Sequence, residues 1–157
     1  MSKPCSKCKG EMSTTVLDPF FGEEGGLKLT IQGMPSLVCA QGHKRFMNIE
    51  FAAQLMDLVM TAETYLGIPV AQKKGFFKKR YHCPGCGQEL PEAPTGRKTQ
   101  EVVAELPKAQ AFKVVVDVPV FRCQACGKDS IHSVEETGRL AFKATDHAYR
   151  SIDIHPT

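Results

Sequence analysis

The chain lacks the long hydrophobic runs that mark membrane proteins. Nowhere in its 157 residues do apolar side chains continue for the roughly 18 residues that a membrane-spanning helix needs. The first residues, Met1 to Cys5, also carry no charged segment followed by an apolar run, as a secretion signal would. We therefore expect a cytoplasmic protein that does not enter a membrane.

A strong excess of charge is missing too. The formal net charge is +3, which is too small to require a nucleic-acid partner. The positive charge is concentrated in residues 73–80, which hold five Lys or Arg and no acid. This segment is either a solvated linker or a nucleic-acid site in which cations meet phosphates and bases stack on aromatic rings. The residues of that candidate site are Lys73, Lys74, Phe76, Phe77, Lys78, Lys79 and Arg80.

Seven cysteines are the first feature that the chain does have. In a reducing compartment, paired cysteines favour metal binding or redox chemistry over structural disulfides, and an odd number fits a disulfide framework poorly. If the chain divides into two halves of roughly 50 to 75 residues, each half buries little apolar surface and needs a staple. The cysteines therefore predict metal sites.

The second half carries the more regular motif. Cys83 and Cys86 are separated by two residues, and Cys123 and Cys126 repeat this spacing further along. In each pair a turn directs both thiolates at one ion, and two such pairs complete the tetrahedral shell of a structural zinc site. A rubredoxin-like iron site uses the same sulfur ligands, so iron is the alternative metal here.

The first half is less regular, because Cys5 and Cys8 form a pair but Cys39 stands alone. His43 is the expected fourth ligand, since Gly42 can turn the backbone and an imidazole reaches further than a thiol. Seven cysteines and one histidine then fill two four-ligand sites with no ligand left over. We expect two structural zinc ions, because neither site leaves a coordination position for water or substrate.

Redox and catalytic roles are the weaker alternatives. A single Cys-x-x-Cys pair can be a redox dithiol, but no thioredoxin-like context surrounds either pair. The remaining histidines do not group at catalytic-metal spacing and are expected on the surface: His82, His132, His147 and His155. With no phosphate-binding loop and no defensible Ser-His-Asp order, we expect that the protein is not an enzyme.

The two halves repeat a short pattern ahead of their second ligand group. In each, a β-rich stretch runs into a proline, Pro35 or Pro119, which precedes Cys39 or Cys123 by four residues. Proline lacks the amide donor of a sheet ladder and suits a strand start or an edge. We interpret this agreement as an internal duplication, so the chain is a tandem repeat.

Residues 48–67 predict an amphipathic helix with Asn48 as its N-cap and Gly67 as its stop. We expect the apolar stripe along one side of this helix to pack on the core of the protein or to form a homodimer or partner-helix surface. Its apolar side chains recur every three or four residues: Phe51, Leu55, Leu58, Val59, Ala62, Tyr65 and Leu66. Short strands are expected at 27–31, 102–106 and 112–116, and one weak helix in the tail after residue 137.

These features predict a small zinc-stabilised α+β fold, in which two zinc-ribbon (rubredoxin-like) β units are joined by a helix and a basic linker. Because each ligand set lies within its own half, we expect fragments 1–68 and 78–157 to fold separately with zinc. The expected boundaries are 1–47 for the first ribbon, 48–67 for the helix, 68–80 for the linker, 81–140 for the second ribbon and 141–157 for the tail.

The ligand motifs resemble those of the zinc-ribbon superfamily. In the second half, Cys-x-x-Cys, a long β insertion and Val-Pro-Val-Phe-Arg-Cys-x-x-Cys-Gly, followed by Glu135, Glu136 and Leu140, resemble the YgiT/MqsA-type finger of bacterial antitoxins. That resemblance implies a finger that binds zinc and contacts a partner toxin. The family's DNA-reading helix-turn-helix has no counterpart after either finger. The first half, with Cys5-x-x-Cys8, Cys39-x-x-x-His43 and Phe46, is similar to the amino-terminal ribbon of some ribosomal RNA methyltransferases.

Two functions from different classes remain open at this point. The resemblance, the Met-bearing helical stripe and the nearly balanced charge of the second half favour a regulatory or protein-interaction module. The basic segment 73–80 favours a nucleic-acid-binding zinc ribbon.

Overall fold

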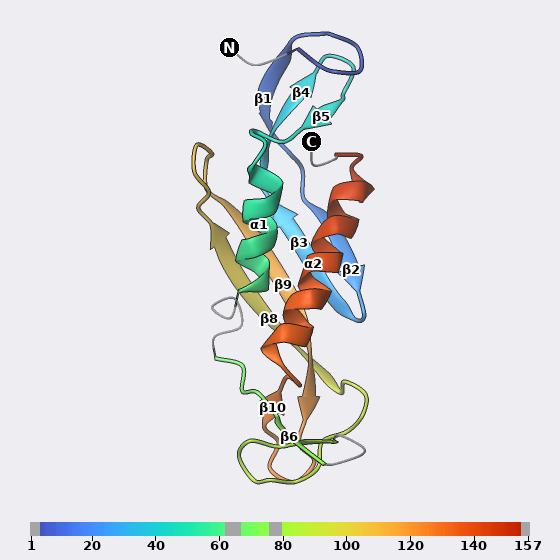
Figure 1. The fold of residues 1–157 in the computed structure, drawn as a ribbon, viewed down its shortest axis with the longest axis vertical. Coiled ribbons are helices and arrows are strands. Elements are labelled where there is room, and N and C mark those ends of the chain that lie inside the picture. Colours follow the sequence, from blue (N-terminus) through green and yellow to red (C-terminus); the bar gives the residue numbers. More distant parts are fainter. Residues whose placement is uncertain (1–3, 62–66, 76–79, 155–157) are drawn as a thin grey trace.

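The structure, a computed structural model, describes residues 4–61, 67–75 and 80–154. Figure 1 shows an elongated molecule with a small β structure at each end and a larger sheet with two helices between them. The fold class is α+β, as expected. In chain order the elements are β1 (Met12–Val16), β2 (Phe20–Glu24), β3 (Leu27–Gln32), β4 (Pro35–Cys39), β5 (Lys44–Arg45), α1 (Phe51–Met60), β6 (Gln72–Lys74), β7 (Arg80–His82), β8 (Gly96–Ala104), β9 (Phe112–Arg122), β10 (Asp129–Ser130) and α2 (Val134–Ser151).

An antiparallel sheet joins the two halves of the chain. Strands β2, β3, β9 and β8 lie side by side in that order, and β10 pairs with the last residues of β9. The central pair crosses between the halves, with β3 running from Lys28 opposite Asp117 to Gln32 opposite Lys113 on β9. The halves therefore share one sheet, and we revise the expectation that fragments 1–68 and 78–157 fold separately.

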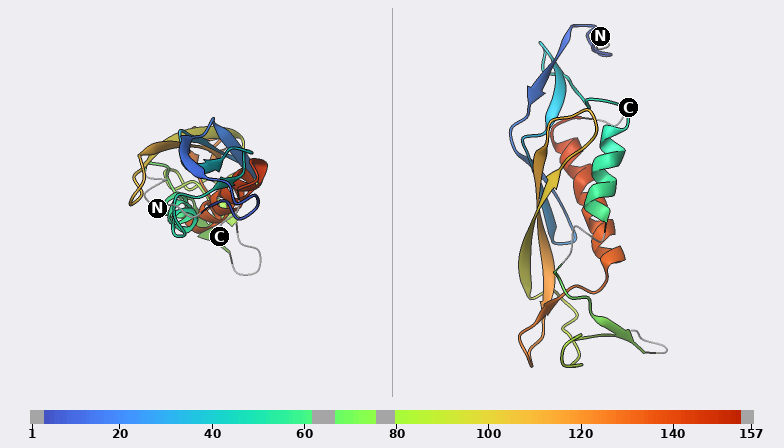
Figure 2. Two further views of the ribbon diagram at one scale, coloured as in Figure 1. Left: turned by 90° about the horizontal axis from the view of Figure 1, so that it is seen from above. Right: turned by 90° about the vertical axis from the view of Figure 1, so that its left-hand side faces the viewer.

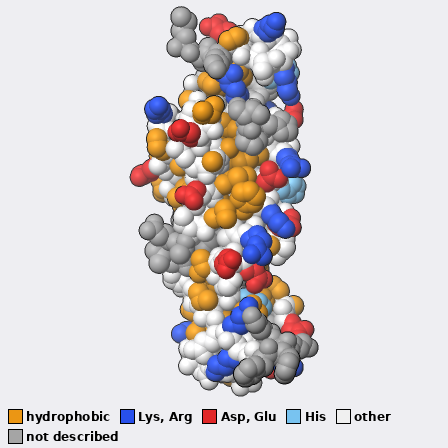
Figure 3. All heavy atoms as spheres, viewed as in Figure 1, with side chains coloured by type: hydrophobic (Ala, Val, Ile, Leu, Met, Phe, Trp, Pro, Cys, Tyr) orange, Lys and Arg blue, Asp and Glu red, His pale blue; other side chains and the backbone are white. Residues whose placement is uncertain are grey.

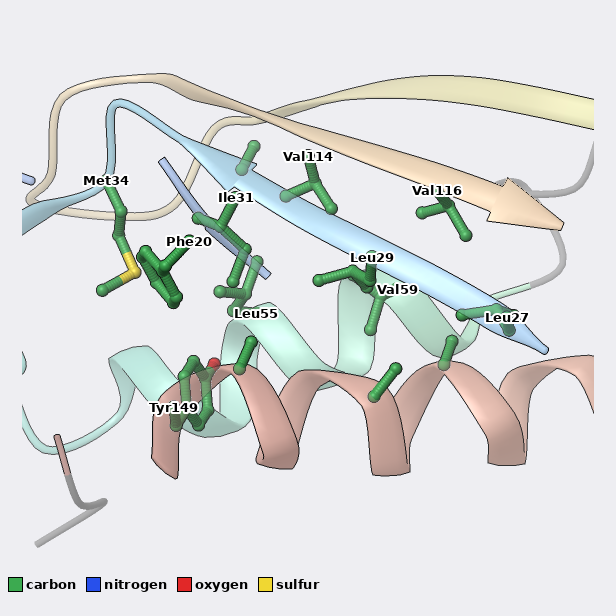
Figure 4. Packing of buried hydrophobic residues seen from close by; sticks show 14 of the residues in the cluster. Phe20, Leu27, Leu29, Ile31, Met34, Leu55, Val59, Val114, Val116 and Tyr149 are labelled. Atoms are coloured by element: carbon green, nitrogen blue, oxygen red, sulfur yellow. The ribbon is translucent and has the colours of Figure 1, made fainter. Parts of the chain in front are cut away.

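Side chains alternate across this sheet and place the core on one face. In β3, Leu27, Leu29 and Ile31 are buried, whereas Lys28 and Gln32 are exposed. Both helices cover the buried face (Figure 2). Figure 4 shows the side chains of β3, β9 and the helices packed into the layer between them, so the main hydrophobic core lies in the middle of the molecule and not at the metal clusters.

Helix α1 occupies part of the predicted range 48–67. It begins at Phe51, and Glu50 rather than Asn48 is its N-cap residue. The Asn48 side chain instead accepts a hydrogen bond from the Glu50 N–H, one step before the helix. Thr61, with an extended backbone at ψ 153°, ends the helix. Residues 62–66 of the predicted helix lie outside the described residues.

The apolar stripe of α1 packs within the chain. Phe51, Leu55 and Val59 are fully buried, and Leu58 is partly buried against the same core. Core packing thus accounts for the part of the stripe that the structure describes, while Met60 remains 42% exposed. A homodimer through this helix stays a prediction.

Helix α2 starts at Val134, before the range after residue 137 in which we expect one weak helix, and covers 18 residues. It begins after Ser133, whose side chain accepts a hydrogen bond of 2.9 Å from the N–H of Glu136. Ser133 and Glu136 have the spacing of a capping box, a helix-start signal that the sequence carries. The expected boundary between the second ribbon and the tail, at residues 140 and 141, falls inside this helix.

Helix α2 lies against β2 at very short range. A Cβ added to Gly22 would stand 1.9 Å from the Ala144 carbonyl oxygen and 2.5 Å from the Ala148 nitrogen. Only glycine allows the helix backbone to come so close to the strand. Since β2 belongs to the first half and α2 to the second, this contact joins the halves a second time.

The described part of the predicted linker 68–80 is held against the second ribbon. Ala71 donates its N–H to the Ile131 carbonyl at 2.8 Å, and Ile131 donates to the Pro69 carbonyl at 2.9 Å. Strands β6 and β7 then pair antiparallel. Residues 67–75 are therefore structured, while 76–79 lie outside the described residues.

The two halves share part of their order of elements. Each has a Cys-x-x-Cys turn, a strand that ends at the second ligand turn, a short strand and a helix, but the first half has four strands between its ligand turns and the second has two. The duplication stays a prediction. The halves differ at Gly33, whose positive φ of 74° separates β3 from β4. At the equivalent Asp117, β9 continues unbroken.

Among the described residues, no helix combines the length and the apolar character needed to cross a membrane.

On the face shown in Figure 3, hydrophobic side chains gather over the middle of the molecule, where α1 and α2 lie.

Candidate metal centres

Three of the four ligand turns share one backbone arrangement. In each, the first cysteine donates its N–H to the carbonyl five residues later and accepts from the N–H four residues later. The residue that donates back is Lys9, Gly87 or Gly127, and all three have positive φ angles of 60°, 80° and 77°. This arrangement turns the chain back on itself and brings the second thiol, three residues after the first, to the same cluster.

The fourth turn is shorter by one residue. Cys39 donates its N–H to the His43 carbonyl at 3.1 Å and accepts from the Gly42 N–H at 2.9 Å. Gly42 takes the positive φ, here 87°. The left-handed residue thus comes before the ligand, and the longer imidazole of His43 reaches the cluster from the next position, as the sequence predicted.

The first cluster brings together Cys5, Cys8, Cys39 and His43, whose ligand atoms all lie within 4.8 Å of one another. His43 Nδ1 lies 3.5 Å from Cys5 Sγ and 3.4 Å from Cys39 Sγ. A tetrahedral zinc ion, with bonds of about 2.3 Å to sulfur and 2.0 Å to nitrogen, separates these atom types by about 3.5 Å. The cluster therefore has the dimensions of a closed metal site.

The second cluster consists of Cys83, Cys86, Cys123 and Cys126, whose sulfur atoms also all lie within 4.8 Å of one another. Its sulfurs lie 3.6 Å apart between Cys83 and Cys126 and 3.4 Å apart between Cys86 and Cys123. In a tetrahedral zinc site two sulfurs are about 3.8 Å apart. All eight residues predicted as ligands are thus assembled into two groups that could hold a metal ion.

The backbone of the turns favours the thiolate form of the first ligand in each half. The Cys8 N–H lowers the pKa of Cys5 to about 6, against the opposing effect of burial. The Cys86 N–H likewise lowers the pKa of Cys83 to about 6. The Gln88 N–H lowers the pKa of Cys86 as well, but its hydrogen bond with Cys123, burial and the other thiols together raise it to about 11. Metal binding requires all these thiols to lose their protons.

The two clusters differ in their access to solvent. The first has two buried and two half-buried ligands. The second has two buried thiols, while those of Cys86 and Cys126 are exposed. An ion in the second cluster is therefore the easier one for a chelator or a thiol reagent to reach.

Two of the three described cations of the basic segment contact other side chains of the chain. Arg80 forms an ion pair of 3.0 Å with Glu89, and Lys73 Nζ lies 5.8 Å from the centre of the Tyr81 ring. Lys74 is exposed on β6. The other four residues of the candidate nucleic-acid site, Phe76, Phe77, Lys78 and Lys79, lie outside the described residues, so nucleic-acid binding by this segment stays a prediction.

A ring stack beside the second cluster was not among the predicted features. His132 lies between Tyr81 and Phe121, with ring centroids 3.7 Å and 3.5 Å away. These aromatic residues stand two positions before Cys83 and Cys123, so the stack ties together the two strands that enter the metal turns. Burial lowers the pKa of His132, which is half-buried and not on the surface as expected. In the sequence, the signal for this stack was an aromatic residue two positions before the first cysteine of each pair, Tyr81 before Cys83 and Phe121 before Cys123.

Comparison with known proteins finds no family model, no curated protein and no solved structure that matches the chain. The protein is therefore described by its own fold and by its two ligand clusters. It is a small α+β protein with two zinc-ribbon-like units, each carrying four residues that could hold a metal ion.

Proposed function

We propose that this protein is a non-catalytic binding module whose two ribbons are each closed by a structural zinc ion. The number of ligands supports this proposal, because each cluster supplies four ligand atoms and no cysteine of the chain lies outside the clusters. Three sulfurs and one imidazole suit zinc. The four-sulfur cluster suits zinc or iron. Because the first cluster favours zinc, we propose zinc for both clusters.

A structural role for the metal follows from the same count. Four protein ligands leave no position at which zinc can activate water or polarise a substrate. Over residues 4–61, 67–75 and 80–154, these two are the groups of three or more His, Cys, Asp or Glu close enough to hold an ion. Bound zinc would then contribute to folding, which small β units of this kind need.

A protein partner fits the second ribbon better than a nucleic acid does. Two cations at this end of the molecule are paired with carboxylates, Arg122 with Asp129 and Arg80 with Glu89, both at 3.0 Å. The motif likeness to the YgiT/MqsA-type finger, which contacts a partner toxin in that family, supports the same choice. We therefore propose that the second ribbon is the protein-binding end.

The zinc proposal is tested by adding zinc to the reduced, metal-free chain and following circular dichroism and thermal unfolding. We expect the folded signal to be complete at two equivalents, and at one equivalent for the variant Cys126→Ala. A metal-free chain that is already folded, and that gains no stability from zinc, would contradict a structural role.

The partner proposal is tested by capture from native lysate with and without nuclease treatment. A partner that binds the second ribbon directly should be retained after nuclease treatment and lost with Cys126→Ala, while His43→Ala retains it. Loss of the captured protein on nuclease treatment would contradict the proposal, because it would show that nucleic acid bridges the two proteins.

A further inference from the structure

A cavity of about 230 Å³ lies beside the first metal cluster. Four separate segments build its wall: Cys5, Ser6 and Lys7 from the first ligand turn, Met12 from β1, His43, Lys44 and Arg45 at β5, and Asp153 beyond the end of α2. Figure 1 shows how α2 brings the C-terminal end of the chain back to the first ribbon. The cavity therefore exists only in the folded chain.

The cavity collects three cations and one acid. Lys44 and Arg45 are half-buried, whereas most such side chains keep their charges fully in water. Lys7 lies 3.6 Å from Asp153, with side chains 54% and 74% exposed, so this ion pair is weak. The three cations thus outnumber the Asp153 carboxylate and the single net negative charge that a zinc ion with three thiolates and one neutral imidazole would carry beside the cavity.

The equivalent strand of the second ribbon shows why this charge is unusual. There, Asp129 of β10 lies opposite Arg122 and forms an ion pair with it at 3.0 Å. In the first ribbon the corresponding residue of β5 is Lys44, which lies opposite the uncharged Val38. The first ribbon therefore has a cation at the position where the second ribbon has a neutralising carboxylate, and this cation lines the cavity.

His43 contributes a further donor to the wall. Its Nδ1 is the atom that faces the thiols of Cys5 and Cys39, at 3.5 Å and 3.4 Å. A neutral imidazole that binds zinc through Nδ1 carries its hydrogen on Nε2. His43 lines the cavity together with Ser6 and the three cations, of which Arg45 also donates a hydrogen bond of 3.4 Å to the Pro4 carbonyl.

We infer that this cavity binds a phosphate group. Phosphate oxygens accept hydrogen bonds from guanidinium, ammonium, hydroxyl and imidazole N–H groups alike, and the excess of cations favours an anion. The volume falls below the range of about 300 to 1,000 Å³ that is typical for drug-sized ligands. It therefore suits a single phosphate, either free or at the end of a nucleotide whose remaining part lies outside the cavity.

The inference rests on the proposed zinc at the first cluster, because a ligand turn forms part of the cavity wall. The test uses the full chain loaded with zinc, with the metal content measured on the same sample. Inorganic phosphate, adenosine monophosphate and adenosine are titrated at constant ionic strength while the backbone amide resonances are recorded. We expect saturable shifts at Ser6, Lys44 and Arg45 with both phosphates and none with adenosine. Tighter binding of the nucleotide would assign the site to nucleotide ends, and equal binding to phosphate itself.

Three variants sharpen this test. Lys44→Gln should weaken phosphate binding about tenfold, because a charge-assisted donor is lost. Asp153→Asn should strengthen it about threefold, since it removes the opposing carboxylate, and asparagine tolerates the positive φ of 56° at this position. Lys128→Gln, an exposed lysine of the second ribbon, is the matched control and should leave binding unchanged.

Two results would overturn the inference while the zinc proposal stands. One is a protein with both zinc ions but no saturable shifts, and the other is an Asp153→Asn variant that binds phosphate no more tightly than the wild type. Because Asp153 is exposed, this second variant remains informative even if Lys44→Gln fails to fold. A protein without zinc at the first cluster would contradict the proposed function and the inference together.

Discussion

The two ribbons have the same number of ligands but present different surfaces. The first shields its ligands and lines a cavity with cations, whereas the second exposes two thiols and pairs two of its neighbouring arginines with carboxylates. The ligand turns are the part that the ribbons share, and the charges beside the turns are the part that differs. A metal ion held by each cluster would support the fold of that end, and the neighbouring charges would decide what each end can bind.

The largest expected effect concerns whether the ribbons can be separated at all. We predict that neither fragment 1–68 nor fragment 69–157 folds with zinc on its own, because the cut removes the β3–β9 pairing and the contact of α2 with Gly22. Mixing the fragments with zinc should restore the native amide spectrum. Either fragment giving a dispersed spectrum alone would show that the ribbons are independent units after all.

The next effect separates the two clusters. His43→Ala should reduce the zinc content from two ions to one, because three thiols retain the first ion only weakly. His82→Ala is the matched control, since His82 lies beside the second cluster with its Nδ1 3.1 Å from the Gly87 carbonyl but is not a ligand. Two zinc ions in both variants would mean that another group closes the first site.

The shared core is tested at its closest contact. Gly22→Ala should lower the free energy of unfolding by about 3 kcal/mol, because the added methyl group overlaps the backbone of α2. Gly96→Ala is the control, since its Cβ would lie at an ordinary 3.5 Å from Val120, and its cost should stay below about 1 kcal/mol. Equal costs in urea denaturation would contradict the close contact between the halves.

The difference in exposure predicts different rates of metal loss. With excess chelator, the second cluster should lose zinc about tenfold faster than the first, and alkylation should modify Cys86 and Cys126 before any other cysteine. Mass spectrometry of peptides at several times gives the order. Simultaneous modification of both clusters would show that exposure does not control access.

The smallest effect concerns the one non-glycine residue in a shared backbone position. Lys9 has a φ of 60° where the second ribbon has Gly87 and Gly127. Lys9→Gly should therefore stabilise the protein by about 0.5 to 1 kcal/mol, and Gly87→Lys should destabilise it by about as much, since only conformational strain differs at this open position. The same sign for both variants in thermal unfolding would disprove the equivalence of the turns.

The sequence predicted the clusters well because a ligand turn is a local structure. The Cys-x-x-Cys spacing and the glycine before His43 directly indicate the geometry of the turns. No local pattern indicates that β3 pairs with β9, because the branched residues of both strands would suit many partner strands. The cavity was equally hidden, since the chain must fold completely before Asp153 approaches Lys7. The start of α2 at Ser133 was readable from its capping box.

The metal content of the purified protein tests the central claim most directly. The protein should be produced in cells supplied with both zinc and iron, purified without chelators and measured by elemental analysis against protein concentration. The closed count of eight ligands predicts two zinc ions per chain and negligible iron. One metal ion per chain, or a red iron chromophore, would contradict it.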